Sequence, residues 1–531
     1  MAVRDPIREG LAAGWKVYDA ATLGEDLDLQ CDVAIVGSGA GGGVTAEALA
    51  QAGLDVVILE EGPLASSTDF HMREREAYPQ LYQESSARQT ADKSITILQG
   101  RCVGGGTTVN WTSSFRTPAR TLNHWRDAHG LKRTAAADLE PWFARMEERL
   151  GIAPWAVAPN ENNDVLRRGC AKLGYSHGVI ARNVKGCANL GYCGMGCPTN
   201  AKQSMLVTTI PAALARGARL VQRARVTRLA IEDDRVTSLE AAGVAANGAE
   251  PTSTRVRVRA RHFVLAAGGI GSPAVLIRSN APDPAHVLGR RTFLHPTVIS
   301  SALMARRVDG HAGAPQSVFS DQFVEAAPLD GPAGFKLESA PVHPVLVGIT
   351  LPGFGEEHAR WMQKFPNVQV VIALLRDGFH RDSRGGRVAL ASDGTPVLDY
   401  SMTEYLWDGV RRAYLAMAEI QFAAGAQSVM PVHENAAPYA SLREAREAIQ
   451  SLPLRALAPR IVSAHVMGGC AMGPDAGRAV VDEDGRHHQL RNLSVHDGSV
   501  FPTSLATNPQ LSIYAISARN SATLIRALRS T

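Results

Sequence analysis

The strongest constraint on the fold is a glycine-rich turn near the N-terminus, between a predicted strand and a predicted helix. Residues 31–36 are mostly apolar, and Gly37, Gly39 and Gly42 follow in the spacing Gly-x-Gly-x-x-Gly, ahead of a helical stretch over residues 43–52. The first glycine permits a tight turn, the second lets backbone approach a pyrophosphate, and the third lets helix and strand pack closely. Free N–H groups at the start of such a helix attract phosphate. The pattern predicts a dinucleotide site, in preference to a turn that binds nothing.

An acidic residue at the end of the next predicted strand supports the same interpretation. Residues 54–59 are mostly apolar and lead directly into Glu60. In dinucleotide-binding folds, a carboxylate at about this place hydrogen-bonds the ribose hydroxyls of an adenosine. We therefore expect an α/β protein whose first domain is Rossmann-like.

The composition excludes several classes of protein. The chain has 531 residues, a formal net charge of +4 and no block of Lys or Arg, so nucleic acid is not an expected partner. Residues 1–20 carry charges throughout, unlike a signal peptide, and no run of about 18 apolar residues predicts a transmembrane segment. An odd number of cysteines, seven, argues against a secreted disulfide framework. We expect a cytoplasmic protein.

The order of predicted elements indicates two domains, one of them discontinuous. Strands are expected at residues 218–231 and 255–265, and a second glycine-rich turn and helix follow the latter. Alternating apolar runs at residues 345–350 and 368–375 predict antiparallel strands, and residues 386–400 predict a hairpin across an Asp-Gly turn. We expect a leader (1–30), a cofactor domain (31–115, 200–297 and 459–531), a cover and cysteine-loop segment (116–199) and a substrate domain on a mostly antiparallel sheet (298–458).

Two C-terminal segments carry a resemblance to a known family. Residues 463–473 read Ser-Ala-His-Val-Met-Gly-Gly-Cys-Ala-Met-Gly, and residues 497–510 begin Asp-Gly-Ser and end Thr-Asn-Pro-Gln. With the first glycine-rich turn and residues 100–110 and 268–273, they resemble the glucose–methanol–choline (GMC) flavoprotein oxidoreductases. The segments occur in the order expected for that family, and the resemblance covers essentially the whole chain.

Within that family, the chain is most similar to the long-chain (fatty) alcohol oxidases and dehydrogenases. The residues that carry this finer resemblance are 99–111, Leu294-His295-Pro296, 377–400 and 463–473.

The resemblance implies FAD as the cofactor. It places Glu60 on the adenosine ribose, Val226 near the adenine, and residues 104–110 along the flavin. Some relatives attach their flavin through a histidine in the segment that matches residues 103–110, and because this chain has none there, we expect non-covalent FAD. The residues expected to bind FAD are Gly37, Gly39, Gly42, Glu60, Gly104, Gly105, Thr107, Asn110, Val226, Asp497, Gly498 and Pro509.

His465 and Asn508 are the candidate catalytic residues. Oxidation of an alcohol removes the hydroxyl proton and a hydride, and an imidazole, with its pKa near neutrality, is suited to take the proton. The resemblance implies that His465 is this base, that Asn508 hydrogen-bonds the substrate oxygen, and that flavin N5 accepts the hydride. The alternatives are a structural histidine and an asparagine that caps a turn before Pro509.

The resemblance therefore predicts oxidation of a primary, aliphatic, long-chain alcohol to the aldehyde. A sugar or sterol alcohol is the alternative substrate within the family. An alternative of another class is a flavin-binding electron-transfer or redox-sensing subunit. The electrons are expected to pass to oxygen, a quinone or a redox protein, and the sequence does not decide among these acceptors.

Three cysteines, Cys187, Cys193 and Cys197, lie in one glycine-rich loop. Three thiolates suit a metal cluster, and the spacing resembles the iron–sulfur loop of bacterial FAD-dependent glucose and fructose dehydrogenase large subunits. That resemblance implies a 3Fe–4S cluster and a small partner subunit, with a periplasmic or membrane-associated location as the alternative. A tight structural loop, or a disulfide with one spare thiol, is the competing interpretation.

Overall fold

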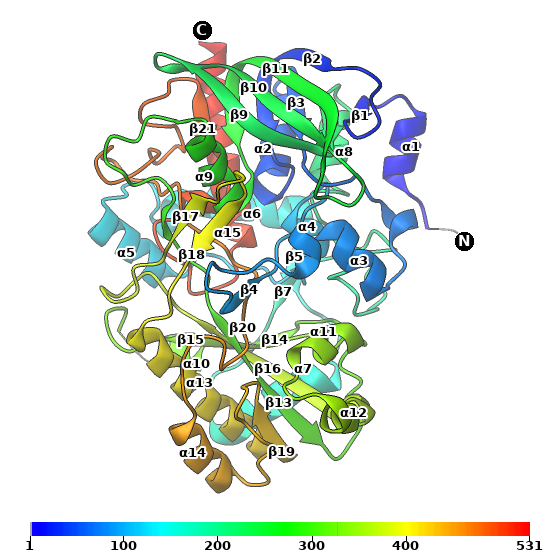
Figure 1. Ribbon diagram of the computed structural model, residues 1–531, viewed down its shortest axis with the longest axis vertical. Coiled ribbons are helices and arrows are strands. Elements are labelled where there is room, and N and C mark those ends of the chain that lie inside the picture. Colours follow the sequence, from blue (N-terminus) through cyan, green and yellow to red (C-terminus); the bar gives the residue numbers. More distant parts are fainter. Residues whose placement is uncertain (1–2, 326–327, 531) are drawn as a thin grey trace.

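The computed structural model describes residues 3–325 and 328–530, and its elements form two stacked parts, each built on one large sheet (Figure 1). The upper sheet has the strand order β1-β8-β3-β2-β11-β10-β9, with β21 beside β11. Its centre is parallel, whereas β9, β10 and β11 pair in antiparallel fashion. Its strands are β1 (Val17–Asp19), β2 (Leu27–Val36), β3 (Val56–Leu59), β8 (Arg219–Gln222), β9 (Ala224–Glu232), β10 (Arg235–Val244), β11 (Pro251–Leu265) and β21 (Leu493–Val495).

Helices cover the upper sheet because its central strands are apolar on both faces. Val33, Ala34 and Ile35 of β2 have no exposed surface, as expected for a parallel sheet between helical layers. The glycine-rich helix α2 packs against α8 and against the C-terminal helix α15. The helices of this part are α1 (Pro6–Ala12), α2 (Ala40–Gln51), α3 (Glu74–Leu81), α4 (Gly106–Val109), α5 (Ala119–His129), α6 (Ala136–Leu150), α8 (Thr209–Leu214), α9 (Gly268–Arg278) and α15 (Gln510–Arg529).

The lower sheet is antiparallel except for one pair, β4 with β20. Helices α7 and α13 pack together on it. Its elements are β4 (Ile95–Ile97), β6 (Gly178–Val179), β13 (Thr297–Met304), β14 (Val318–Ser320), β15 (Phe335–Ser339), β16 (Val368–Leu375), β19 (Ala426–Pro431), β20 (Ile461–Ser463), α7 (Glu161–Leu173), α10 (Gln322–Glu325), α11 (Pro344–Thr350), α12 (Gly355–Gln363), α13 (Glu404–Ala423) and α14 (Leu442–Ser451).

Two small sheets complete the fold. Strands β12 (Arg290–Thr292), β17 (Gly386–Leu390) and β18 (Pro396–Asp399) form the first, and β5 (Ile152–Pro154) and β7 (Ala181–Asn183) form the second. None of the described helices combines the length and the apolar character that crossing a membrane requires.

The predicted α/β class, the strand–turn–helix at the N-terminus and the hairpin over residues 386–400 are confirmed. Three local predictions need correction. Residues 345–350 form helix α11 rather than a strand, because Pro344 begins a helix and only Val347 of the apolar run is buried. The strand expected at 218–231 breaks at Arg223, which has a left-handed φ of 51°. Residues 1–30, expected as a leader separate from the cofactor domain, contribute β1 and the start of β2 to the upper sheet.

Candidate active site

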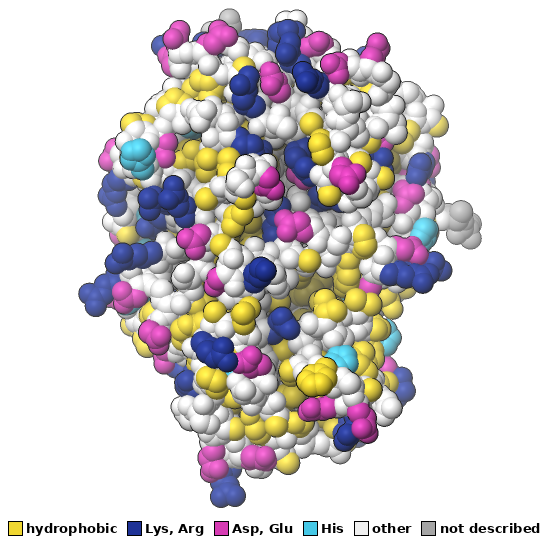
Figure 2. Space-filling view, in the orientation of Figure 1, with side chains coloured by type: hydrophobic (Ala, Val, Ile, Leu, Met, Phe, Trp, Pro, Cys, Tyr) yellow, Lys and Arg dark blue, Asp and Glu magenta, His cyan; other side chains and the backbone are white. Residues whose placement is uncertain are grey.

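A cavity of about 1190 Å³ connects the upper sheet to the lower one. It begins at the glycine-rich turn, passes residues 98–113, and ends among side chains of β13, β15 and β16. Figure 2 shows the hollow between the two halves, with hydrophobic side chains gathered around it. A cavity at the carboxyl ends of parallel strands is where α/β folds bind their cofactors.

The glycine-rich turn has the geometry that its sequence predicts. Gly37 has a φ of 98°, and a Cβ atom there would lie 2.3 Å from the Ala266 carbonyl oxygen. Gly42 faces the strand, where a Cβ would lie 2.0 Å from the Gly37 carbonyl oxygen. Around Gly39, by contrast, the nearest heavy atom to such a Cβ is Gly105 Cα, at 3.8 Å. The open space beside Gly39 is the cavity itself.

This turn also fits the phosphates of a dinucleotide. Gly39 is the N-cap of α2, and no side chain caps the helix, so its first N–H groups are available to an anion. The glycine turn that ends at Gly105 packs against Gly39, so that two glycine-rich backbone segments border the cavity side by side. The residues therefore fit FAD, whose pyrophosphate the uncapped N–H groups of α2 would hold.

Most of the residues predicted to bind FAD line this one cavity, although they come from distant parts of the chain. Gly42 and Gly104 do not line it: Gly42 packs α2 on β2, and the N–H of Gly104 donates to Ser38 Oγ at 3.0 Å. The predicted residues that line the cavity are Gly37, Gly39, Glu60, Gly105, Thr107, Asn110, Val226, His465, Asp497, Gly498, Asn508 and Pro509.

Two buried carboxylates hold the cavity wall in shape. Glu60 accepts hydrogen bonds from the N–H groups of Ser38 (3.0 Å) and Gly62 (2.9 Å), while burial raises its pKa. Asp497 accepts from the N–H groups of Gly268 and Ser499, both at 2.8 Å, and burial raises its pKa as well. Each carboxylate thus joins two backbone turns that border the cofactor cavity.

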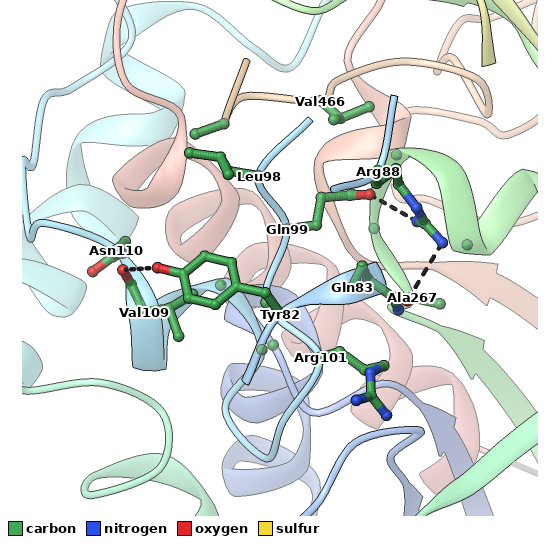
Figure 3. A pocket seen from close by; sticks show the side chains of 18 of the residues that line it. Tyr82, Gln83, Arg88, Leu98, Gln99, Arg101, Val109, Asn110, Ala267 and Val466 are labelled. Atoms are coloured by element: carbon green, nitrogen blue, oxygen red, sulfur yellow. Dashed lines mark hydrogen bonds between the residues drawn. The ribbon is translucent and has the colours of Figure 1, made fainter. Parts of the chain in front are cut away.

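One wall of the cavity comes from a segment that carries no sequence motif. Tyr82, Gln83 and Arg88, in a part of the expected cofactor domain without a motif, line the cavity beside residues 98–110 (Figure 3). Tyr82 donates to the Gly194 carbonyl oxygen at 2.7 Å, with the Val109 carbonyl oxygen also near at 3.4 Å, and Arg88 donates to Gln99 Oε1 at 2.9 Å. These contacts fix the wall, and a single sequence offers no signal for them.

The two candidate catalytic residues both reach the end of the cavity that borders the lower sheet. His465 follows β20 and is half-buried, and loss of contact with water lowers its pKa to about 4. Its Nδ1 lies 3.3 Å from Nδ1 of His295. Asn508 is buried and donates through Nδ2 to Glu338 Oε2 at 3.2 Å, while its Oδ1 has no hydrogen-bond partner among the described residues.

Glu338 is a cavity residue that sequence reasoning missed. It lies on β15, is fully buried, and accepts from Gln316 Nε2 at 2.7 Å as well as from Asn508. Burial raises its pKa to about 7, against the opposing effect of Lys336. Lys336 and Glu338 are two residues apart on β15, and this pattern alone indicates no function. The place of Glu338 in the site depends on its contact with Asn508, which is distant in the sequence.

Replacing Glu338 with Gln should change the pH dependence of stability. Below pH about 4.5 this carboxyl is protonated in the folded and in the unfolded protein, so it adds no pH dependence to the stability. Between about 4.5 and 7 the unfolded chain loses the proton, whereas the folded protein keeps it. The wild type therefore loses stability as pH rises through that range. We expect the Tm of Glu338→Gln, relative to wild type, to be higher by a few degrees at pH 8 than at pH 4.5. A Tm difference that stays constant with pH would contradict this.

The three loop cysteines share one small hollow, whose Arg182 donates to Thr112 in the wall of the main cavity. Cys187, Cys193 and Cys197 are all free, and the hollow is lined by each of them. Burial opposes ionisation of Cys197, but hydrogen bonds from Thr199 and from the Lys202 backbone lower its pKa overall. Among residues 3–325 and 328–530, no group of three or more His, Cys, Asp or Glu side chains is placed to hold a metal ion.

One cavity connects the Rossmann-like turn with His465 and Asn508. This arrangement is typical of a dinucleotide-dependent redox enzyme. Family models described as GMC oxidoreductase match residues 78–297 and 382–517, and a model of an NAD(P)-binding Rossmann-like domain matches residues 35–69. The chain belongs to the GMC oxidoreductase family. It is accordingly an FAD-dependent oxidoreductase that acts on CH–OH donors.

Three relatives illustrate this membership. An uncharacterized GMC-type oxidoreductase of Mycobacterium tuberculosis is 32% identical over 490 residues, which cover 92% of this chain and 74% of the relative. A long-chain-alcohol oxidase of Arabidopsis thaliana is 27% identical, over 92% of this chain and 68% of its own length. The crystal structure of pyridoxine 4-oxidase from Mesorbium loti has a TM-score of 0.66 at 19% identity, covering 94% of this chain and 99% of the other, and so shares the fold.

Proposed function

We propose that the protein oxidises a primary aliphatic alcohol to the aldehyde and prefers long chains. The observation that carries this proposal is the lining of the cavity beyond His465 and Asn508. There the strands of the lower sheet and α11 present apolar side chains, which suit an alkyl chain. These residues are Ile299, Leu346, Val347, Val370, Ile372 and Leu374. The long-chain-alcohol oxidase among the relatives supports the same substrate class.

Each catalytic residue has a definite task in this proposal. His465 takes the hydroxyl proton of the alcohol, and its lowered pKa keeps the imidazole in the neutral, proton-accepting form at physiological pH. Asn508 hydrogen-bonds the substrate oxygen by donating the second Nδ2 proton, since the first is donated to Glu338. FAD, bound non-covalently, supplies the acceptor for the hydride. Gly37, Gly39 and Glu60 hold that cofactor.

The substrate class is tested by anaerobic titration of the FAD-loaded enzyme with alkan-1-ols of increasing length, followed by flavin absorbance. Each methylene that enters the apolar end of the cavity should stabilise the complex by up to about 0.8 kcal/mol, which is about fourfold in apparent affinity. The rise should end when the chain fills the cavity. Equal efficiency for ethanol, dodecanol and a sugar alcohol would contradict the proposed preference.

A 3Fe–4S cluster at Cys187, Cys193 and Cys197 stays a separate prediction. Their spacing and their shared hollow support it, and the lack of a metal-holding arrangement among the described side chains weighs against it. Iron analysis of anaerobically purified protein decides the matter. About three iron atoms per chain, lost on Cys193→Ser without loss of flavin reduction, would support a relay to a partner subunit. If the protein contains no iron, the electrons would pass directly from the flavin to an external acceptor.

A further inference from the structure

Two segments that the sequence singles out, residues 294–296 and 377–400, meet behind His465. His295 lies between β12 and β13 and is only 1% exposed. Its Nδ1 faces Nδ1 of His465 at 3.3 Å, and the two ring centroids are 5.6 Å apart. The second segment supplies Asp377 and Tyr400, which hold the backbone that carries His295.

The backbone at His295 is in an uncommon conformation that its neighbours enforce. Its φ is 53°, in the left-handed region, which non-glycine residues adopt only when the surroundings determine it. The carboxylate of Asp377 accepts from the N–H groups of Leu294 (3.0 Å) and His295 (3.2 Å). Tyr400 donates to the same carboxylate at 2.8 Å. This clamp, formed by Asp377 and Tyr400, fixes the position of the His295 ring.

The pairing of the two rings constrains the protons that they carry. Because Nδ1 of His465 faces His295, Nε2 is the nitrogen left for a substrate in the cavity. A neutral imidazole carries one proton, so Nε2 can accept another only if the ring proton is on Nδ1. That Nδ1–H then requires an acceptor, and the atom opposite it is Nδ1 of His295. Burial, the neighbouring His465 and Lys336 lower the pKa of His295 well below its ordinary value, so His295 is neutral and able to accept.

We propose that His295 is a positioning residue for the oxidation, whose Nδ1 accepts the Nδ1 proton of His465. This hydrogen bond keeps His465 in the tautomer and orientation in which Nε2 takes the substrate proton. When that proton arrives, the resulting imidazolium keeps its Nδ1–H bonded to neutral His295, and FAD, when bound, would take the hydride from the alcohol carbon. The proposal rests on the proposed role of His465 as the base. With Nδ1 as the acceptor, the single proton of neutral His295 lies on Nε2, which is buried and has no hydrogen-bond partner among the described residues.

Two substitutions at His295 separate positioning from packing. His295→Gly removes the acceptor, and glycine suits the left-handed backbone. His295→Asn keeps a polar acceptor close to the position of Nδ1, and asparagine also tolerates this conformation. The matched control is His433→Asn, since His433 is equally buried but outside the cavity, where it bonds the Pro453 carbonyl oxygen.

The measurements are the anaerobic rate of flavin reduction by an alkan-1-ol, the apparent Kd for that alcohol, bound FAD per chain, and Tm. We expect His295→Gly to slow reduction about 10- to 100-fold, the usual effect of losing a residue that orients a catalytic group, with unchanged FAD content and unchanged Kd. His295→Asn should recover most of that rate, and His433→Asn should match wild type. The double variant His295→Gly/His465→Ala should be no slower than His465→Ala alone.

A wild-type rate in His295→Gly, an equal loss in His295→Asn, or additive losses in the double variant would overturn the inference. If His295→Gly does not fold, His295→Ala, which also lacks the acceptor, takes its place in the single and the double variant. A wild-type rate in His465→Ala would instead overturn the proposed base and thereby the function on which the inference rests, so the two failures are distinguishable.

Discussion

His465→Ala should slow flavin reduction by an alcohol about 100- to 10,000-fold, the range expected when a general base is removed. Without the imidazole, no neutral base remains at the position where the hydroxyl proton must leave. Water cannot replace it well, because the cavity end is lined by apolar strands. The measurement is rapid anaerobic mixing of the FAD-loaded variant with excess alkan-1-ol, with the flavin absorbance as readout.

Two variants control this result. Asn508→Ala should cause a smaller loss, because it removes one hydrogen bond to the substrate oxygen rather than the proton acceptor. His433→Ala, at a buried histidine outside the cavity, should reduce its flavin at the wild-type rate. If His465→Ala also did so, with its FAD content intact, His465 would not be the base.

Gly39→Val should abolish most FAD binding while leaving the chain folded. A Cβ at Gly39 meets only Gly105 Cα, at 3.8 Å, and φ there is −68°, so the backbone tolerates a side chain. That side chain enters the space where the pyrophosphate must approach the backbone. If the valine side chain overpacks the FAD site at a cost of about 3 kcal/mol, the affinity for FAD falls about 100-fold or more. Because the FAD is expected to be non-covalent, acid precipitation releases it for direct quantification in the supernatant.

The control for Gly39→Val is Gly24→Ala, because Gly24 has no atoms within 4 Å of its Cβ position and does not line the cavity. It should keep a full complement of FAD. Circular dichroism and Tm of the FAD-free forms check that both variants are folded. A Gly39→Val variant with full FAD occupancy would mean that the cofactor does not approach this turn.

The parts of the fold that the sequence predicts well are those determined by local pattern. The turn from residue 37 to residue 42 lies between a strand and a helix, and the structure has both. Residues 345–350 show the limit of this reasoning, because β-branched residues favour strands on average. Pro344 and the burial of only one face nevertheless produce helix α11. Arg223 shows the same limit, since its left-handed φ depends on the turn between β8 and β9.

The site was predictable where a motif marks it and unpredictable where packing creates it. His465 and Asn508 lie within recognisable segments, and the fold brings both to one cavity. Glu338 and His295 each contact a partner 170 residues away in the chain. No local pattern encodes such a contact, so their roles appear only once β15, β13 and β20 are assembled in one sheet.

The central claim is that a bound alcohol delivers its hydride to the flavin of this protein. The most direct measurement is anaerobic mixing of the purified FAD-loaded enzyme with a single long-chain alkan-1-ol, followed by flavin absorbance and by analysis of the organic product. The account predicts bleaching of the oxidised flavin and one aldehyde per flavin reduced. A flavin that stays oxidised with every alcohol, yet is reduced by a redox-protein donor, would contradict the account and indicate an electron-transfer subunit.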